Sequence, residues 1–506
     1  MDSLLSQLLS FPPHPPPVVP LPDAEVDRGL RRIVKLLNEV PAKKLTAGIS
    51  GGDGGDLLDI LDPSINSLPY LYVLVAHINS VASGKLPLGS KTSALLPGGR
   101  LWGPLLRFME HFDPIQVRYG GAEFKRFISA IETAARKAAM PAVAIHPIQL
   151  AISRLDPSGA CFTSTHLIFV QLCMETREFH MAKPVLDKDV YSFPGNHRTG
   201  ASNPLHRLIC SRNQSSSNFT TPSSGFTEKI SSKDILQYFL LGGMIYTALK
   251  DWERAVHFYD MAIITPAANV VSKIQLEAYN KRLLVGILWK GICLEMPKTT
   301  TAVAQRAYRA TSKAYEAVAE IFEDSIKKEK GPLQLILEID AGQDIWQESA
   351  NIGLVKQVFT SFRRFSVLKL GKTYSSMTIA DVARQTSPDP NDFSETAAYL
   401  QWLISTGQLN ASMVERGTTH QTWVLKFGEE LESLSEGQQL QELKKTEARI
   451  RDLSARVRES DQKVGLSKEY LEWSRKAEAK VKDEVPAAFQ DLMDEYIHDE
   501  DMMTDT

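Results

Sequence analysis

Hydrophobic residues recur three and four positions apart along most of this 506-residue chain. This spacing places them on one face of an α-helix. The pattern runs from about 66 to 190, broken by Pro and Gly into consecutive segments, and resumes from 234 to about 345. Consecutive helices with one apolar face each can bury those faces by stacking along the chain. The sequence therefore predicts a mainly α protein built as a helical-repeat solenoid.

The segment "GGMIYTALKDWERAVHFYDMAIITPA" (242–267) has the spacing of a tetratricopeptide repeat. Pro266 is expected to end the second helix of the pair. We expect Gly243 and Ala255 to face each other where the two helices approach most closely, while aromatic side chains fill the groove to the next pair. None of these residue types is suited to catalysis, so the predicted role is packing. The residues assigned to it are Gly243, Tyr246, Ala255, Tyr259 and Ala262.

Residues 346–428 show a different pattern, with helices followed by two short strands. Thr378 with Asp381, and Asp392 with Glu395, have the spacing of helix N-caps. Two later segments alternate apolar and polar residues with the period of half-buried strands. Their apolar residues are Leu409, Ala411 and Met413 in the first segment, and Trp423, Leu425 and Phe427 in the second. Three helices and a β-hairpin predict a winged helix.

The segments between and beyond these patterns differ in composition. Residues rich in Ser, Thr and Asn near 192–232 cannot bury enough apolar surface to offset the entropy of ordering them. The last 24 residues carry nine carboxylates and no Lys or Arg. The predicted organisation is a flexible Pro-rich arm (1–25), N-terminal helical repeats (26–190), a mobile Ser-rich insertion (191–233), tetratricopeptide-like repeats (234–345), the winged helix (346–428), C-terminal helices (429–482) and an acidic disordered tail (483–506).

Composition and charge narrow the function classes. The net charge of −3 gives no field that would draw the whole molecule towards nucleic acid or anionic lipid. The four cysteines form no CxxC pair and no disulfide framework, which favours a reducing compartment. The N-terminus lacks the basic region of a signal peptide, and no apolar run reaches the roughly 20 residues that span a bilayer. We expect a soluble intracellular protein.

Winged helices often bind DNA, so a nucleic-acid binder is the alternative that this module raises. The would-be recognition helix, 392–406, contains Asp392 and Glu395 and no Lys or Arg, so its exposed face cannot neutralise phosphate. The turn of the hairpin offers only Arg416 and His420. A solvated face explains more simply the basic residues of the preceding helix, Lys356, Arg363, Arg364, Lys369 and Lys372. We expect no direct nucleic-acid contact, and we expect the hairpin edge to pair with a neighbouring protein.

Motifs for catalysis and for metal binding are missing from the sequence. No two of the eleven histidines are spaced H-x-H, and HExxH is absent, so the common zinc-hydrolase patterns do not occur. GxSxG and GxGxxG are absent as well. Cys161 or Cys173 with His166 suggests a thiol nucleophile, but a cysteine packed between helices as a small apolar residue is the simpler explanation. The sequence predicts no enzyme, no metal and no cofactor.

Helical repeats that lead into a winged helix resemble the PCI domain, which subunits of the proteasome lid, the COP-nine signalosome and the eukaryotic initiation factor three complex share. Within this group, four segments are similar to the subunit-three family of the signalosome. They are "TSTHLIFVQLCMETREF", "LGGMIYTALKDWERAVHFYDMAIITPA", "EAYNKRLLVGILWKGICLEMPKTTT" and "NIGLVKQVFTSFRRFSVLKLGKTYSSMTIADVA". The similarity is dense from about 145 to 428 and fades on either side.

The resemblance implies a non-catalytic scaffold subunit of a complex that removes a ubiquitin-like modifier from cullins, in the cytoplasm and nucleus. A separate zinc isopeptidase subunit carries out that chemistry. The expected direct partners are other PCI subunits of the signalosome, and the isopeptidase and the cullin-RING ligases are indirect ones, with no membrane involved. A proteasome-lid or initiation-factor-three subunit of the same architecture is the alternative.

Two surfaces follow from the resemblance. In this family the winged helices associate side by side through their sheets, and the C-terminal helices gather into a bundle. The hairpin at the first interface would be built by Leu409, Met413, Trp423, Leu425 and Phe427. The bundle helix would present Leu443, Ile450, Leu453, Val457 and Val464. Thr446 and Ser460 disfavour a long two-stranded coiled coil, and a helix folded back on its own domain stays an alternative.

Overall fold

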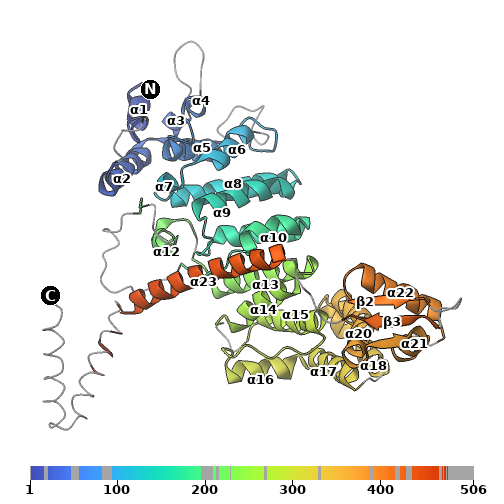
Figure 1. Ribbon diagram of the computed structural model, residues 1–506. Helices are drawn as coiled ribbons and strands as arrows, with labels where there is room; N and C mark the ends of the chain where they lie inside the picture. Colours follow the sequence, from blue (N-terminus) through green and yellow to red (C-terminus); the bar gives the residue numbers. More distant parts are fainter. Residues whose placement is uncertain are drawn as a thin grey trace, which may run out of the picture. The chain divides into compact units, whose positions relative to one another are not determined.

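A computed structural model shows how the elements of the chain are arranged (Figure 1). It divides into two units, 1–196 with 207–429 and 197–206 with 430–506, and each is described by itself. The residues that the structure describes are 2–15, 21–46, 56–82, 94–194, 209–211, 216–227, 229–266, 271–328, 332–387, 389, 391–415, 422–428, 436–465, 470, 472–473 and 476.

The first unit is built almost wholly of helices, so the predicted mainly α fold with stacked helical repeats is confirmed. Before the tetratricopeptide-like pair it has α1 (Asp2–Leu8), α2 (Asp23–Glu39), α3 (Ala42–Leu45), α4 (Leu57–Ile60), α5 (Ser67–Ala82), α6 (Trp102–His111), α7 (Pro114–Val117), α8 (Gly121–Lys137), η1 (Pro141–Ala144), α9 (Ile145–Leu155), α10 (Ser164–Thr176), α11 (Phe179–Leu186), α12 (Ser216–Phe219) and η3 (Pro222–Ser224). The helices that follow are α13 (Ser232–Ala248), α14 (Trp252–Ile264), α15 (Lys273–Lys290), α16 (Ala302–Thr311), α17 (Lys313–Lys327), α18 (Leu333–Ala341) and α19 (Gln343–Glu348).

Local sequence signals fix where several of these helices begin and end. At the start of α13 the Asp234 N–H donates to the Ser231 hydroxyl, 3.3 Å away, and the Ser231 N–H donates to the Asp234 carboxylate, 2.8 Å away. Ser272 and Gln275 form the same reciprocal capping box at the start of α15. Gly291 ends α15 with a φ of +70°, a left-handed conformation that favours glycine.

The α13–α14 pair holds all five residues that the repeat pattern singled out. Tyr246, Ala255, Tyr259 and Ala262 are fully buried, and Gly243 is buried beside them. The nearest neighbour of Gly243 is the ring of Tyr259: a β-carbon built on the glycine would lie 2.5 Å from ring atom Cε1. The expected pairing of Gly243 with Ala255 stays a prediction. The Tyr259 ring of α14 reaches α13, where its hydroxyl lies 2.9 Å from the Thr247 hydroxyl.

The N-terminal segment packs more than the predicted flexible arm would. Leu8 at the end of α1 is fully buried, and it forms a small core with residues of α2, which begins at Asp23. The ring of Phe11 lies against Gly29, where a β-carbon would come within 2.5 Å. The Pro-rich composition of this segment hid these two apolar anchors. Residues 16–20 lie outside the described residues.

Part of the predicted mobile insertion also packs into the repeats. Phe219 and Phe226 are buried against each other, and Phe226 meets Phe124 of α8 edge-to-face. The Arg118 guanidinium stacks 4.2 Å from the Phe219 ring and donates to two backbone carbonyls, of Ile209 and Ser211, at 3.0 Å. Residues 216–227 thus differ from the prediction, because two aromatic residues anchor an otherwise polar segment. Outside the described residues lie 195–208, 212–215 and 228.

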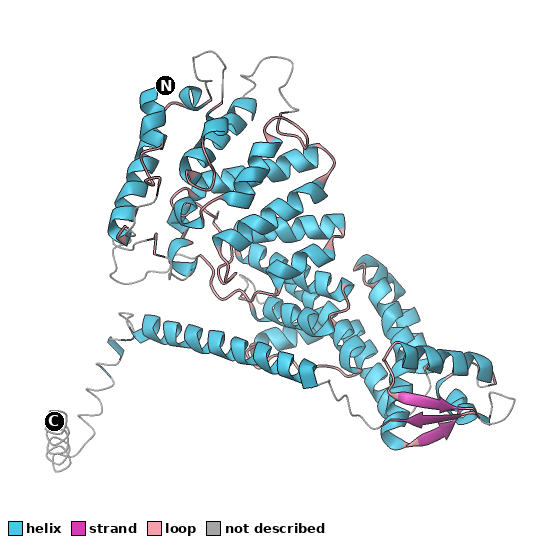
Figure 2. Cartoon of the chain, turned by 45° about the horizontal axis from the view of Figure 1, so that its top comes forward, coloured by secondary structure: helices cyan, strands magenta, loops and turns pink. Residues whose placement is uncertain are grey.

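The C-terminal part of the first unit consists of three helices and one antiparallel sheet (Figure 2). Its elements are α20 (Ile352–Thr373), β1 (Ser376–Thr378), α21 (Ile379–Thr386), α22 (Phe393–Ser405), β2 (Ala411–Val414) and β3 (Val424–Phe427). The sheet order is β1-β3-β2, so the last strand in sequence is the central one. The sequence predicted β2 and β3 and missed β1. This order of elements is compatible with a winged helix, which stays a prediction for the module.

The second unit contains one long described helix, α23 (Glu436–Gly465). It coincides with the charged helical stretch that the sequence predicted after residue 428. The acidic tail, 483–506, lies outside the described residues, and the predicted domain boundaries stay predictions.

Candidate interaction surfaces

The edge of strand β2 has backbone groups available for pairing. The Gly428 N–H donates to the Asn410 carbonyl at 2.9 Å, which makes these two opposite residues a hydrogen-bonded pair. Because such pairs alternate in an antiparallel ladder, Ser412 and Val414 bond to β3, whereas Ala411 and Met413 direct their backbone groups away from it. Among the described residues no strand pairs with that outer edge.

Strand β1 forms the opposite edge of the sheet, and sequence reasoning missed it. It has three residues and no clear alternation of burial, so the period-two signal could not find it. Met377 lies opposite Leu425, and the Ile379 N–H donates to the Trp423 carbonyl at 2.8 Å just beyond the strand. Strand β3 is therefore paired on both sides, and only β1 and β2 can offer an edge.

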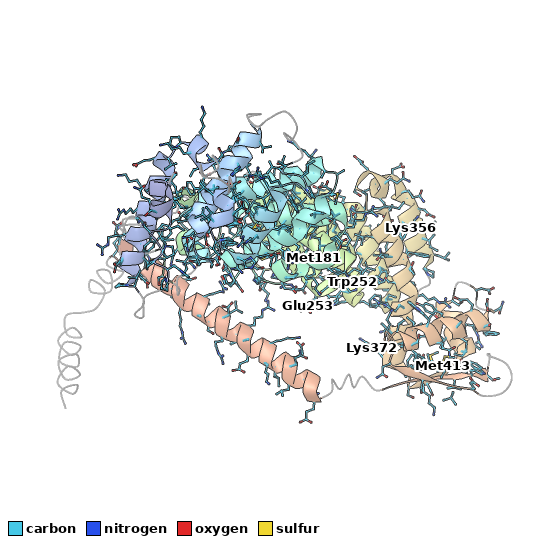
Figure 3. The ribbon with its side chains drawn as sticks, turned by 90° about the horizontal axis from the view of Figure 1, so that it is seen from above. Met181, Trp252, Glu253, Lys356, Lys372 and Met413 are labelled. Carbon is cyan, nitrogen blue, oxygen red and sulfur yellow. The ribbon has the colours of Figure 1, made fainter. Side chains whose placement is uncertain are left out.

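The five residues assigned to the hairpin interface lie mainly in the core of the module. Leu425 is fully buried and Leu409 is 5% exposed. Met413, Trp423 and Phe427 are partly buried against the same core, and Phe427 packs on Gly371 of α20. The structure brings all five together. Their side chains hold the sheet on its helices, so contact with a neighbour would come from the strand edge (Met413 is labelled in Figure 3).

The basic face of α20 is partly used within the molecule. The Arg363 guanidinium donates to both oxygens of Glu395 at 2.6 and 2.8 Å and stacks 4.2 Å from the Tyr399 ring. Arg364 donates to the Leu288 carbonyl of α15 at 2.9 Å, and burial lowers the pKa of its guanidinium. Both cations thus bind this chain's own groups. Residues 416–421, which include the two basic residues of the hairpin turn, lie outside the described residues.

Helix α23 carries an apolar stripe that the described residues of its unit leave exposed. Leu443, Ile450 and Val457 are 67%, 59% and 59% exposed, and they repeat every seven residues. Leu453 on the same side is 38% exposed. The side chain of Val464 lies outside the described residues. A row of aliphatic residues on a charged helix is typical of a helix that packs against others.

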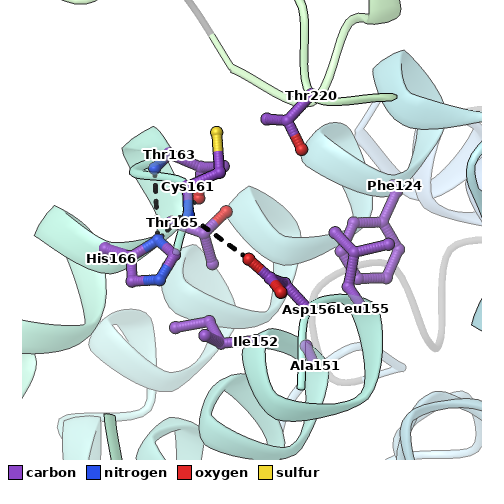
Figure 4. Close-up of a pocket in the computed structure, with 10 residues that line it drawn as sticks. All are labelled: Phe124, Ala151, Ile152, Leu155, Asp156, Cys161, Thr163, Thr165, His166 and Thr220. Carbon is purple, nitrogen blue, oxygen red and sulfur yellow. Dashed lines mark hydrogen bonds between the residues drawn. The ribbon is translucent and has the colours of Figure 1, made fainter. Parts of the chain in front are cut away.

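A small cavity of about 20 Å³ lies beside Cys161 and His166, the candidate thiol and histidine (Figure 4). It lies between α8, α9, the start of α10 and the segment around Thr220. Substrate pockets commonly enclose about 300–1,000 Å³. This cavity has room for about one water molecule. Its lining residues are Phe124, Ala151, Ile152, Leu155, Asp156, Cys161, Thr163, Thr165, His166 and Thr220.

His166 beside this cavity is a capping residue. Its Nδ1 accepts a hydrogen bond from the Thr163 N–H at 3.2 Å, in the capping box that begins α10. The lone pair is therefore on Nδ1 and the proton on Nε2. Burial lowers the pKa of His166 to about 4. The imidazole is thus neutral at physiological pH and bonded to the backbone.

The two candidate nucleophiles are poorly suited to reaction. Burial raises the pKa of the Cys161 thiol and of the Cys173 thiol to about 12, so each stays protonated at neutral pH. A reactive cysteine needs the opposite shift, because the thiolate is the nucleophile. Cys173 is fully buried in the main core and Cys161 is 2% exposed. Both therefore serve as packing residues.

Within the described ranges, no group of three or more His, Cys, Asp and Glu side chains is placed to hold a metal ion. No helix in the described part of the chain is long and apolar enough to cross a bilayer.

Comparison with known proteins gives the family. A family model described as "COP9 signalosome complex subunit 3, N-terminal helical repeats" matches residues 52–304. A curated relative named COP9 signalosome complex subunit 3, from Emericella nidulans, is 34% identical over 427 residues, which cover 84% of this chain and 83% of the relative. A relative of the same name from Neurospora crassa is 24% identical over 421 residues, covering 83% and 78%. The resemblance predicted from the sequence is confirmed, and the chain belongs to the COP9 signalosome subunit 3 family.

Proposed function

We propose that this chain is a non-catalytic scaffold subunit of the COP9 signalosome, the complex that deneddylates cullin-RING ubiquitin ligases. The proposal rests on one observation, the 427-residue alignment with a relative named COP9 signalosome complex subunit 3. This alignment covers 84% of this chain and 83% of the relative. The chemistry of the described residues supports the non-catalytic part. The candidate thiols are buried and protonated, and the candidate histidine is held by a helix cap.

The scaffold role uses two surfaces in this proposal. The open edge of β2 pairs with the sheet of a neighbouring PCI subunit, and the aliphatic stripe of α23 enters a bundle of C-terminal helices. The isopeptidase subunit and the cullin-RING ligases are then indirect partners. The complex acts in the cytoplasm and nucleus.

Affinity purification of the tagged full-length chain from its native cells tests the proposal. We expect the signalosome subunits, including the zinc isopeptidase, to co-purify in stoichiometric amounts. Recovery of proteasome-lid or initiation-factor subunits in their place would favour the alternative of the same architecture.

A second measurement separates scaffold from enzyme. The purified chain alone, mixed with neddylated cullin, should release no modifier, whereas the purified complex should. Turnover by the isolated chain, free of the isopeptidase by mass spectrometry, would contradict the non-catalytic role.

A further inference from the structure

Two leucines of α18 point away from the rest of the first unit. Leu333 and Leu337 are 73% and 69% exposed and lie one helical turn apart on the same face. Leu335, on the opposite face, is fully buried, and α18 packs against α17 and α20. A surface helix ordinarily turns its aliphatic side chains towards the core. Leu333 and Leu337 therefore form an apolar ridge that the described part of this unit leaves uncovered.

Helices α18 and α19 carry four carboxylates and no Lys or Arg, and the nearest described lysines, Lys327 and Lys328 of α17, pair with Glu323 and Asp324. No Lys or Arg occurs between Lys330 and Lys356, whereas the same stretch contains Glu338, Asp340, Asp344 and Glu348. None of these four carboxylates has a cationic partner among the described residues. Asp340 follows Leu337 by three positions and so shares its face of α18. An exposed apolar pair beside unpaired carboxylates favours a partner that supplies both apolar and positively charged groups.

We propose that α18 and α19 bind a basic amphipathic helix of a neighbouring subunit. Aliphatic side chains of that helix pack on Leu333 and Leu337, and its Lys or Arg side chains pair with Asp340 and Asp344. A helix fits because two residues one turn apart form a ridge that packs into the groove between side-chain rows of another helix. The charges at the rim set orientation and speed of association. This inference rests on the assembly role proposed above and adds a third surface to it.

Other occupants fit this charge pattern less well. Nucleic acid and anionic lipid would be repelled by the carboxylates. A second copy of the chain that used the same face would bring like charges together, because a two-fold interface pairs a surface with itself. The chain's own α23 has six carboxylates against seven basic residues and so carries almost no net positive charge.

Photo-crosslinking within the native complex tests the inference. A benzophenone amino acid replaces Leu337 in the full-length chain, and a matched variant carries it at Val303, which is 62% exposed on α16, a helix with no carboxylates. We expect position 337 to crosslink one peptide of another subunit that has aliphatic residues at helical spacing and at least two Lys or Arg beside them. Position 303 should not reach that peptide. Crosslinks from 337 to α23, to a second copy or to an acidic peptide, or no crosslink at all, would overturn the inference.

Charge dependence provides a second readout in the same complex. Asp340→Asn combined with Asp344→Asn leaves the fold intact, because both side chains are exposed, and it should lower the crosslinking yield at position 337 several-fold. High salt should do the same to the unsubstituted complex, because it screens exposed charges. Equal yields under all three conditions would contradict the pairing with a basic helix. If the chain never enters the complex, the assembly role fails instead. If the complex assembles fully and position 337 gives no crosslink, only this inference is contradicted.

Discussion

Gly243 has no side chain, and the ring of Tyr259 occupies the space that a β-carbon would need. The same holds for Gly242, whose neighbour is the ring of Phe258. At the scale of single residues, close approach between α13 and α14 is thus set by two glycines that face two aromatic rings. Tyr246, near the end of α13, is also fully buried and donates to the Asp187 carboxylate at 2.6 Å. These contacts explain the small-aromatic spacing without any reactive group.

Gly243→Ala should destabilise the chain, because its methyl group would overlap the Tyr259 ring. Overpacking of this kind commonly costs about 1–3 kcal/mol. The measurement is the midpoint of urea unfolding, followed by circular dichroism on the full-length protein. Gly353→Ala is the matched control, since a β-carbon there meets nothing within 4 Å, and its midpoint should be unchanged or slightly raised. Equal midpoints for the two variants would show that the close approach at Gly243 is unimportant.

His166 predicts a stability that depends on pH. Its pKa is lowered from the ordinary value of 6.5 to about 4 by burial, so the unfolded chain binds a proton at a higher pH than the folded chain does. The contribution of the neutral imidazole to the free energy of unfolding is complete above pH 6.5 and is lost as the pH falls towards 4. At 1.36 kcal/mol per pKa unit, the loss amounts to about 3 kcal/mol. Urea unfolding at several pH values measures it.

His166→Gln is the control for this pH dependence. Glutamine at this position keeps the capping-box pattern with Thr163 but does not titrate. The difference in unfolding free energy between the two proteins should therefore change by about 3 kcal/mol across the window from pH 6.5 to 4. Parallel curves for the two proteins would exclude His166 as the titrating group.

At the scale of the elements, the central strand β3 determines which edges of the sheet can pair with another protein. Both of its sides are occupied, by β1 and by β2, so its residues build the module while the outer strands offer the edges. Ala411 and Met413 direct their backbone groups outwards, whereas Ser412 between them bonds inwards. A substitution at Ala411 can therefore test pairing at the edge, and a substitution at Ser412 can test the fold of the module.

Ala411→Pro should impair assembly while leaving the module folded. Proline removes an N–H group that points away from β3, and prolines are tolerated on edge strands. The expected result is weaker co-purification with the neighbouring subunits and an unchanged thermal unfolding temperature. Normal incorporation of this variant would count against docking through the β2 edge.

Ser412→Pro provides the contrasting control. It removes an N–H group that bonds to β3, so it should lower the unfolding temperature as well as assembly. If both proline variants unfold at the lower temperature, the inward and outward assignment along β2 is wrong.

Long amphipathic segments and capping motifs could be predicted from the sequence, because their signals are local. The α13–α14 pair, the Thr378 cap and both strands of the hairpin are examples. Strand β1 could not, because its three residues take their conformation from pairing with β3. Phe219 and Phe226 were missed for a related reason: the polar residues around them conceal two long-range contacts, with Arg118 and with Phe124. Which edge is open also depends on the sheet order, which no local pattern contains.

Two units make up the whole molecule. The first has separate hydrophobic cores along its helical repeats and in the C-terminal module. In the second, the described helix α23 has an aliphatic stripe and nearly balanced charge. The near-neutral total of −3 thus hides separate local surfaces. Their chemistry, aliphatic ridges and strand edges, suits contacts with other proteins.

Removing residues beyond 430 should weaken assembly without unfolding the first unit. All of α23 is lost in this truncation, whereas every element from α1 to β3 is kept. We expect reduced co-purification with the other subunits and a retained helical circular-dichroism spectrum. Substituting Leu443, Ile450 and Val457 by Ser in the intact chain should reproduce the defect. Full assembly of both proteins would leave α23 without a role in the bundle.

The contact between α8 and the 216–227 segment has a practical consequence for anyone who edits this gene. A β-carbon on Gly121 would overlap the Ser224 carbonyl oxygen, and one on Gly225, at a φ of +83°, would come within 2.6 Å of the Ala122 nitrogen. The backbone at the start of α8 and the backbone of the 216–227 segment are therefore in direct contact. Although its Ser-rich composition makes this stretch look like a convenient place for an epitope tag or a deletion, changes there would be transmitted to α8, whose Phe124 and Phe127 lie in the main core.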